Sequence, residues 1–421
     1  MNFEDSVEEA TYRREVYNWL VANAELRLPG ELPASIAERE NPAQIKAAQD
    51  WQARKFDAGW ACITWPREYG GCDGTAMEAV IWQQEQAKFR IPPEVFTIGI
   101  GMAAPTIMHY GTPEQKAQWL PRCARGDEIW CQLFSEPSAG SDLASLRTKA
   151  VKDGDEWVVN GQKIWTSGGH YADWGILLAR TDFDAPKHAG ITFFVVDMKS
   201  PGIETRRIRQ ITGDANFNEV YFTDLRIPDD NRISEVGNGW RVALTTLMME
   251  RGAINLDSPG GVSLDDLFEL ANEVAVDGKL AIEQEGIREQ LADYYTKTTA
   301  LRFLSFRNLT TLSRGGALGP SAAIVKLVTG KLRQQMGALG MELQGSAGAL
   351  EEREGTANNG GWQYAYLYSP GVRVAGGTDE IMRNVIAERV LGMPQEPRVD
   401  KSMSFREFQT RQKKPRTSGS Q

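Results

Sequence analysis

The sequence predicts a multidomain α+β protein in which a central antiparallel, barrel-like β domain separates an N-terminal all-α domain from a C-terminal four-helix bundle. The chain has 421 residues, which is too many for a single ordinary core. The hydrophobic pattern changes from helical to strand-like near residue 129 and becomes helical again near residue 237. We therefore expect domains over 1–128, 129–236 and 237–396, followed by a flexible basic tail over 397–421.

Helices are expected throughout the first domain. The stretch 75–90 places its apolar residues near the helical spacing. Another helix is expected over 114–120, because Thr112 is a suitable N-cap residue and Pro113 suits the first helical position.

The expected central sheet consists of short runs that are rich in β-branched and aromatic residues. Glycine, proline, asparagine and aspartate separate these runs, as turns between strands require. No helix of useful length intervenes, which favours an antiparallel or barrel-like sheet over a doubly wound one. The runs are EWVVNGQKIWTS (156–167), WGILLART (174–181), GITFFVVDM (190–198) and NEVYFTDLRIP (218–228).

Long amphipathic segments return after Gly237 and predict the helix bundle. The residues after about Pro397 are polar and basic, and they predict a flexible segment or an arm that lies on a neighbouring subunit. The segments expected to build the bundle are 239–254, 285–312, 321–339 and 378–392.

The bulk composition excludes several classes of protein. A net charge of −9 and a pI near 5.2 argue against a general nucleic-acid binder. No segment has the apolar length that a membrane span needs, and the acidic N-terminus is not that of a signal peptide. Four scattered cysteines indicate reduced thiols in a cytoplasmic protein, and three histidines without metal-ligand spacing predict no metal site.

Two segments of small residues are candidates for a ligand site. The small residues of SEPSAGSD (135–142) allow the backbone to approach a ligand closely, and its hydroxyl and N–H groups suit a flavin edge or a pyrophosphate. A plain surface turn is the alternative. IWTSGG (164–169) places a tryptophan beside a hydroxyl pair, where it could cover an aromatic ring or simply belong to the core. GIGMAA (99–104) fits a dinucleotide fingerprint, but Pro105 interrupts the helix that should follow.

Six blocks resemble the acyl-CoA dehydrogenase family, in family order, and together they span roughly residues 10–395. The resemblance implies FAD as cofactor and an acyl-CoA thioester as substrate. It also implies removal of an α-proton, transfer of a β-hydride to flavin N5, and an electron-transferring flavoprotein as acceptor. The blocks are GWACITWPREYGG (59–71), YGTPEQKAQWLP (110–121), CQLFSEPSAGSDLASLRT (131–148), NGQKIWTSGG (160–169), FNEVYFTDLRIP (217–228) and AGGTDEIMRNVIAERVLG (375–392).

The resemblance assigns flavin contacts to residues of the central domain. Phe134 and Ser135 match the groups at the pyrimidine edge, and Ser141 matches the serine near the pyrophosphate. Trp165 matches the tryptophan beside the isoalloxazine, and Ser167 matches the hydroxyl near N5.

Further contacts are implied for the C-terminal domain. Thr378 matches the threonine that contacts the flavin, and Glu380 is assigned to the cofactor with it. Thr378 is also a good N-cap, and a helix N-terminus favours an anion. The segment QGSAG (344–348) resembles the family's glycine-rich contact with a second subunit's flavin, which assigns Gln344 and Gly345 and implies a homodimer or homotetramer.

The catalytic base differs from that of many family members. They carry a glutamate directly before a Gly-Thr pair, where this chain has Gly376, although a backbone N–H there can still bind the thioester oxygen. Isovaleryl- and long-chain-type members instead place the base on the first bundle helix before an arginine, which here assigns Glu250 before Arg251. Burial at that position would raise a carboxylate pKa toward the working pH; a surface glutamate paired elsewhere is the alternative. The apolar stripe expected beside Glu250 consists of Trp240, Ala243, Leu244, Leu247 and Ile254.

A second departure concerns the adenosine end of the flavin. Family members carry an R-x-x-F-G segment where this chain reads VAVDGK (274–279), with Val274 and Asp277 in the two marked places. The loss of the arginine makes a mixed tetramer an alternative to the homotetramer. A non-catalytic subunit of such an assembly, and an acyl-CoA oxidase that uses O₂, are alternatives for the function. Gly376 leaves room beside the α-carbon and predicts a long, branched or cyclic acyl group.

Overall fold

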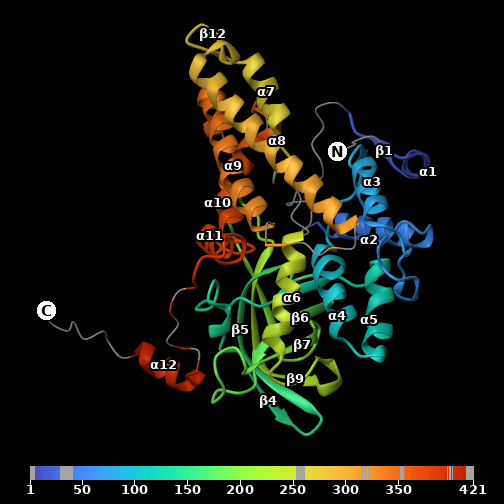
Figure 1. Cartoon of the computed structure of the whole chain (residues 1–421), viewed down its shortest axis with the longest axis vertical. Coiled ribbons are helices and arrows are strands. Elements are labelled where there is room, and N and C mark those ends of the chain that lie inside the picture. Colours follow the sequence, from blue (N-terminus) through green and yellow to red (C-terminus); the bar gives the residue numbers. More distant parts are fainter. Residues whose placement is uncertain are drawn as a thin grey trace, which may run out of the picture. The chain divides into compact units, whose positions relative to one another are not determined.

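The protein is described here from a computed structural model, which forms two compact units (Figure 1). The helical unit contains Met1–Glu94, Gln210–Asp214 and Arg251–Met393, and the sheet unit contains Val95–Arg209, Ala215–Glu250 and Pro394–Gln421. The structure describes residues 5–28, 41–252, 261–313, 316, 319–320, 322–350, 355–395, 397, 400 and 402–413.

Three helices form the N-terminal part of the helical unit: α1 (Val7–Asn23), α2 (Pro42–Asp57) and α3 (Ala76–Gln86). Ser6, Asn41 and Thr75 cap them, because each side chain accepts a hydrogen bond from a first-turn N–H. The helix expected over 75–90 ends at Gln86, after which β2 (Phe89–Arg90) pairs with β1 (Glu25–Leu26). The core between these elements contains Val16, Leu20, Trp51, Ile63, Trp82 and Phe89.

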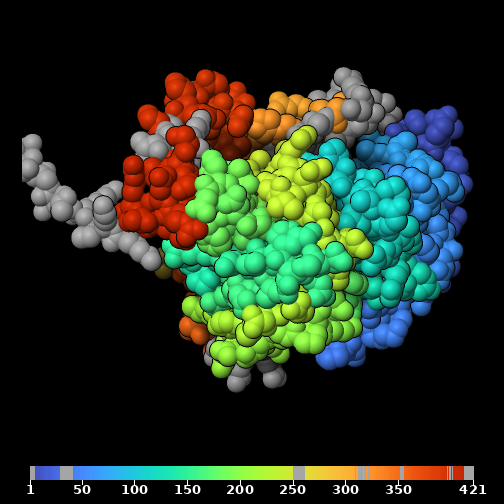
Figure 2. Space-filling model, turned by 90° about the horizontal axis from the view of Figure 1, so that it is seen from below, coloured from blue at the N-terminus to red at the C-terminus, as the bar shows by residue number. Residues whose placement is uncertain are grey.

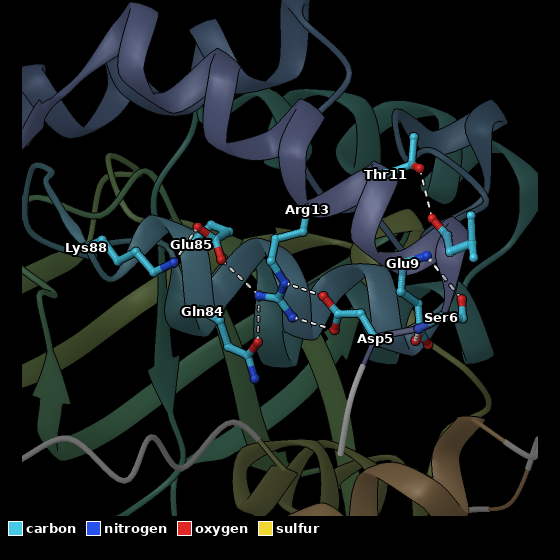
Figure 3. A network of polar contacts seen from close by, with 9 residues as sticks. Asp5, Ser6, Glu9, Thr11, Arg13, Gln84, Glu85 and Lys88 are labelled. Carbon is cyan, nitrogen blue, oxygen red and sulfur yellow. Dashed lines mark hydrogen bonds and ion pairs between the residues drawn. The ribbon is translucent and has the colours of Figure 1, made fainter. Parts of the chain in front are cut away.

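A polar network joins α1 to α3 beside this core (Figure 3). The Arg13 guanidinium donates to Asp5, to Gln84 and, over 2.8 Å, to Glu85. Glu85 has a side chain only 2% exposed and also accepts from Lys88 over 2.6 Å. Burial alone would raise the pKa of Glu85, but the hydrogen bonds from Lys88 and Arg13 outweigh it, so the pKa lies below its usual 4.5.

The bundle part of the helical unit consists of helices that run alongside one another (Figure 1). They are α7 (Leu264–Glu273), α8 (Glu285–Ser313), α9 (Ala322–Leu343) and α10 (Gly361–Val374), followed by α11 (Asp379–Val385). Their shared core includes Leu267, Leu291, Leu332, Leu339 and Trp362.

The predicted C-terminal helix bundle is confirmed, but the helices that form it are not all those that the sequence predicts. The core helices α7 and α10 were not among the four expected segments, whereas α6 (Gly239–Gly252), expected as the first bundle helix, lies largely in the sheet unit. Helix α10 holds Pro370 and several glycines and tyrosines, so its sequence has a weak helical signature. Packing of Trp362, which has no exposed surface, stabilises it in the tertiary structure.

The sheet unit is built on strands in the order β10-β7-β6-β4-β5-β9-β8, with β3 beside β6, among the described residues. This confirms the predicted central sheet domain, and most pairs are antiparallel. The pairings of β6 with β3 and with β4 are parallel, which the sequence did not predict. The strands are β3 (Trp130–Leu133), β4 (Lys149–Asp153), β5 (Glu156–Ser167), β6 (Trp174–Arg180), β7 (Ile191–Asp197), β8 (Ile203–Ile208), β9 (Phe217–Pro228) and β10 (Arg232–Ile233).

Helices accompany this sheet within the same unit. α5 (Pro113–Arg125) begins as expected, with Thr112 as N-cap and Pro113 at the first position. α4 (Ala104–Tyr110) holds α6 through hydroxyl pairs, Thr106 with Thr246 over 2.9 Å and Tyr110 with Thr245 over 3.0 Å.

The C-terminal segment differs from the flexible tail that the sequence predicts. Residues Phe405–Lys413 form helix α12, and the Phe405 ring is fully buried against the sheet unit. The polar and basic composition predicts a flexible segment or an arm on a neighbouring subunit, whereas the two phenylalanines of FREF (405–408) supply an apolar face. Across the described residues, no helix is both long and apolar enough to cross a membrane.

The Glu85 network makes stability at the α1–α3 contact depend on pH. Because the folded pKa of Glu85 lies below 4.5, its contribution is fully present above 4.5 and is lost as the pH falls through the folded value. We expect the stability difference between the wild type and Glu85→Gln to be constant near neutrality and to shrink below pH 4.5. Thermal unfolding followed across that range measures it; a difference that stays constant into the acid range would contradict the assignment.

Candidate functional site

The SEPSAGSD segment forms a tight turn directly after β3. Glu136 and Ala139 exchange backbone hydrogen bonds of 3.1 and 3.0 Å, which places Pro137 and Ser138 at the tip. Before the turn, Phe134 is buried and Ser135 is half-buried. The Ser135 carbonyl accepts the Ile164 N–H over 2.9 Å, so the turn is joined to β5, the strand that carries IWTSGG.

A buried ion pair fixes the same two segments to each other. Lys163 has no exposed surface, and its Nζ lies 2.9 Å from Glu136 Oε1 and donates to the Phe134 carbonyl over 3.0 Å. Glu136 also accepts the N–H groups of Arg147 over 2.6 Å and Thr148 over 2.8 Å. Burial lowers the pKa of Lys163 and opposes ionisation of Glu136, but the ammonium of Lys163 outweighs this and lowers the Glu136 pKa. The backbone of residues 134–136 is thereby held in one position.

Trp165 stands on a bulge in β5. The pairing of β5 with β9 shifts register between Lys163 and Thr166, and Trp165 has a φ of 61°. A left-handed conformation is strained for a residue with a Cβ, and a bulge re-aims the side chain that it carries. The indole is 56% exposed and meets the Phe217 ring edge-on, with centroids 6.0 Å apart. A strained strand therefore presents a broad aromatic face to the outside.

Exposed hydroxyl groups occur both in β5, which carries Trp165, and in the SEPSAGSD segment that is joined to it. Ser167 and Ser141 are exposed, and a Cβ added at Gly140 would meet nothing within 4 Å. The Thr166 hydroxyl is buried and has no hydrogen-bond partner among the described residues. Exposed hydroxyls and open backbone beside an aromatic face fit a flavin ring and its pyrophosphate.

The predicted contacts of the helical unit centre on the loop before α11. Gly376 and Gly377 have φ values of 66° and 99°, which side chains with a Cβ rarely adopt. The ammonium of Lys326, 3% exposed, donates to the Gly377 carbonyl and, over 3.0 Å, to the Arg373 carbonyl. Arg373 in turn pairs with Asp379 over 2.6 Å. The loop backbone is held from inside the unit.

Thr378 and Glu380 flank the start of α11. The Thr378 side chain accepts the Ile381 N–H over 3.2 Å, which confirms the predicted N-cap. Glu380 is exposed, and hydrogen bonds with its own backbone N–H and with Thr378 lower its pKa. The carboxylate thus stays charged at the helix start.

Gln344 and Gly345 lie at the end of α9. The Gln344 side chain is engaged within the unit, because it donates to Gly340 and accepts the Ala357 N–H over 3.0 Å. Gly345 is exposed with a φ of 57°. A contact of this segment with a second subunit's flavin stays a prediction and would use backbone groups rather than the Gln344 amide.

Glu250 belongs to α6, but its side chain lies outside the described ones. The buried face of α6 consists of Val242, Ala243 and Thr246, and Leu244, expected on the apolar stripe, is 45% exposed. That part of the predicted stripe is wrong, and Thr245 and Thr246 of α6 instead form hydroxyl pairs with Tyr110 and Thr106 of α4. Position 250 follows Thr246 by four residues and so shares the register of the buried face.

The segment 274–279 forms a two-residue hairpin. Asp277 and Gly278, with φ values of 51° and 78°, connect β11 (Ala275–Val276) to β12 (Lys279–Leu280), as a type I′ turn requires. Val274 packs against the bundle core. The position that carries the arginine in other members is therefore an apolar packing position here.

Several residues that hold the site were missed from the sequence: Lys163, Glu136, Lys326 and Arg373. A signal existed for Lys163, because strand alternation places it on the same face as the buried Trp157 and Val159, where a cation requires a partner. Nothing in the sequence pairs Lys326 with a loop fifty residues later.

The chain runs from a helical region through a sheet domain to a helix bundle, and the sheet domain carries an exposed tryptophan, exposed hydroxyls and a small-residue turn. This combination is typical of a flavin-dependent oxidoreductase. The family descriptions "Acyl-CoA dehydrogenase, N-terminal domain", "middle domain" and "C-terminal domain" match residues 29–127, 131–225 and 237–391. The chain belongs to the acyl-CoA dehydrogenase family, and its cofactor is FAD.

Individual relatives cover nearly the whole chain. Acyl-CoA dehydrogenase IpdE1 of Mycobacterium tuberculosis is 38% identical over 91% of this chain and 98% of its own. The solved structure named "Tcur3481-Tcur3483 steroid ACAD" is 28% identical with a TM-score of 0.77, covering 94% of this chain and 100% of that one. The ChsE4-ChsE5 complex from Mycobacterium tuberculosis is 29% identical with a TM-score of 0.74, at the same coverage of 94% and 100%.

The buried ion pair gives a test of the site. Lys163→Met removes the ammonium, leaves the Glu136 carboxylate buried alone, and should cost about 3–5 kcal/mol of stability. We expect a lower melting temperature and a lower FAD content, read from flavin absorbance. The double variant Lys163→Met/Glu136→Gln should regain stability but not FAD affinity, because the Phe134 carbonyl still lacks its donor.

Lys149→Met is the matched control, since Lys149 is exposed on the neighbouring strand β4. If Lys163→Met behaves like Lys149→Met in both stability and FAD content, the ion pair does not hold the flavin segment.

Proposed function

We propose that this acyl-CoA dehydrogenase removes the α-proton of a bulky, cyclic or steroid-like acyl-CoA with Glu250 as the base. FAD, when bound, accepts the β-hydride at N5. The observation that carries the proposal is the pair of positions 376 and 250: the first is a glycine, and the second is a glutamate on α6 four residues after the buried Thr246. Removing a proton beside a thioester requires a positioned base with a raised pKa.

The thioester oxygen needs a donor while negative charge develops on it. Gly376 can supply its backbone N–H, and the loop that carries it is fixed by Lys326 and by the Arg373–Asp379 pair. A donor that does not have to reorganise stabilises the developing charge most effectively. The glycine also leaves space for branching near the α-carbon.

Three features support the proposed flavin position. With FAD bound, Trp165 would cover the ring, Ser167 would lie near N5, and the Phe134–Ser135 backbone would meet the pyrimidine edge. Lys163 and Glu136 hold that backbone, so the ring would meet a rigid edge. Ser141 and the open backbone at Gly140 would receive the pyrophosphate, and Thr378 and Glu380 are proposed as contacts from α11.

The acyl group is proposed from position 376 together with the relatives. One structural relative is named a steroid ACAD, and it shares the fold over nearly the whole chain. A fused-ring acyl group requires room close to the reacting carbons, which a glycine provides and a glutamate at that place would occupy.

A mixed assembly is a second candidate for the quaternary structure, in place of a homotetramer. Two structural relatives are named by pairs of chains. In this chain Val274, directly before the β11–β12 hairpin, occupies the place of the family's phosphate-binding arginine and packs against the bundle core. In such an assembly, a partner subunit would supply the missing contact. Copurification with a second dehydrogenase-like subunit, and flavin bound only by the pair, would favour it.

The base assignment is tested with Glu250→Gln. We expect the variant to bind FAD and acyl-CoA, but to reduce its flavin about 10²–10⁴ times more slowly, the usual range for a lost general base. Anaerobic bleaching of the flavin by a panel of steroid-side-chain, alicyclic and short straight-chain acyl-CoA thioesters measures both the base and the substrate class.

Glu269→Gln, an exposed glutamate of α7, is the control and should bleach at the wild-type rate. Bleaching of Glu250→Gln at the control rate would exclude Glu250 as the base. Reoxidation by an electron-transferring flavoprotein is expected; peroxide formed at the turnover rate would identify an oxidase instead.

A further inference from the structure

Helix α12 lies beyond residue 391, where the match to the family's C-terminal domain ends. It docks on the loop between β6 and β7. The N–H of Phe405 donates to the Ala185 carbonyl, and the N–H of Arg406 donates to the Phe183 carbonyl, each over 3.0 Å. Ser404 pairs with Pro186 in an isolated antiparallel β-bridge. In the space-filling view the red C-terminal segment lies against the green sheet unit (Figure 2). The helix is therefore attached by backbone pairing and not only by side chains.

Two cations lie under this helix. The Arg180 guanidinium, with no exposed surface, is 3.5 Å from the centroid of the buried Phe405 ring. Lys187, only 4% exposed, places its ammonium 4.5 Å from the centroid of the Phe408 ring. Burial lowers the pKa of Arg180 to about 10, although Glu136 and Asp182 oppose this, so the guanidinium remains charged at neutral pH. The two rings shield these cations from water and offer them their negative faces.

The same cations hold the segment that follows Ser141. Arg180 donates to the Ala144 carbonyl over 2.6 Å and to the Leu146 carbonyl over 3.1 Å. Lys187 Nζ lies 2.7 Å from the Asp142 carboxylate. Arg180 also donates to the backbone carbonyl of Lys187 over 3.1 Å, so the two cationic residues are joined to each other. Residues 142–146 are thus fixed by groups whose other side is covered by α12.

We propose that α12 is a clamp that acts through Arg180 and Lys187 to position the backbone after Ser141 for the FAD pyrophosphate. The proposal rests on the assignment of Ser141 to the pyrophosphate. Phe405 and Phe408 are positioning residues in this account, since they touch the cations and not the cofactor. A solvated Arg180 would exchange its carbonyl partners for water, and the open segment around Gly140 would lose its fixed neighbour on the C-terminal side.

The test uses the full chain, or the full assembly if a partner subunit is needed, freed of flavin and titrated with FAD. Phe405→Ala should weaken FAD binding by about tenfold, and Phe408→Ala should weaken it in the same direction, with less risk to folding because Phe408 is only half-buried. Hydrogen exchange at the amides of residues 142–147 should become faster in both apoproteins. With saturating FAD, kcat and KM should return to wild-type values.

Arg411→Ala, an exposed residue of the same helix, is the control and should change neither readout. Wild-type FAD affinity in both phenylalanine variants overturns the clamp. Unchanged exchange at residues 142–147 overturns it as well, and this readout applies even to a wild type that binds no FAD. A wild type without FAD affinity would instead overturn the flavin assignment itself.

Discussion

A lysine ammonium with no exposed surface must be neutralised and fully hydrogen-bonded where it lies, and the site of the sheet unit depends on how Lys163 meets this requirement. Its carboxylate partner, Glu136, belongs to the turn after β3, and its other acceptor is the carbonyl of Phe134. Satisfying one buried charge therefore locks the turn against β5. The strained bulge at Trp165 begins two residues further along the same strand, so the exposed indole projects from a fixed base.

The same physical device recurs at the other predicted cofactor segments. Lys326 binds the carbonyls of Arg373 and Gly377 within the helical unit, and Arg180 binds those of Ala144 and Leu146 within the sheet unit. In each case a buried cation holds the loop backbone by donating hydrogen bonds to its carbonyl groups. Loops that are rich in glycine and serine lack side chains that could pack, so an internal charge supplies the rigidity that a cofactor site needs.

Two departures from the family pattern carry the proposals about the base, the acyl group and the assembly. A glycine at 376 removes a side chain from the loop, while the loop's anchors Lys326, Arg373 and Asp379 remain in place. In the segment that resembles the family's R-x-x-F-G, Val274 stands in the place of the arginine, and Asp277 and Gly278 form a turn with φ values that suit aspartate and glycine. The proposals for the base and for a bulky acyl group follow from the glycine at 376. The proposal of a mixed assembly follows from the change in the segment 274–279.

The sequence by itself determined the α–β–α order and the helix caps at Thr112 and Thr378, because periodicity and capping are local properties of the chain. Its small-residue patterns also marked the segments that are proposed to face the flavin. Only the tertiary structure decided which helices share the bundle core, that α6 lies largely in the sheet unit, that α12 is docked rather than free, and that Lys163, Lys326 and Arg180 hold the site. The reason is that a buried cation's partners are often carbonyls far away in the chain. A carbonyl carries no side-chain identity, so no residue pattern in the sequence indicates the contact.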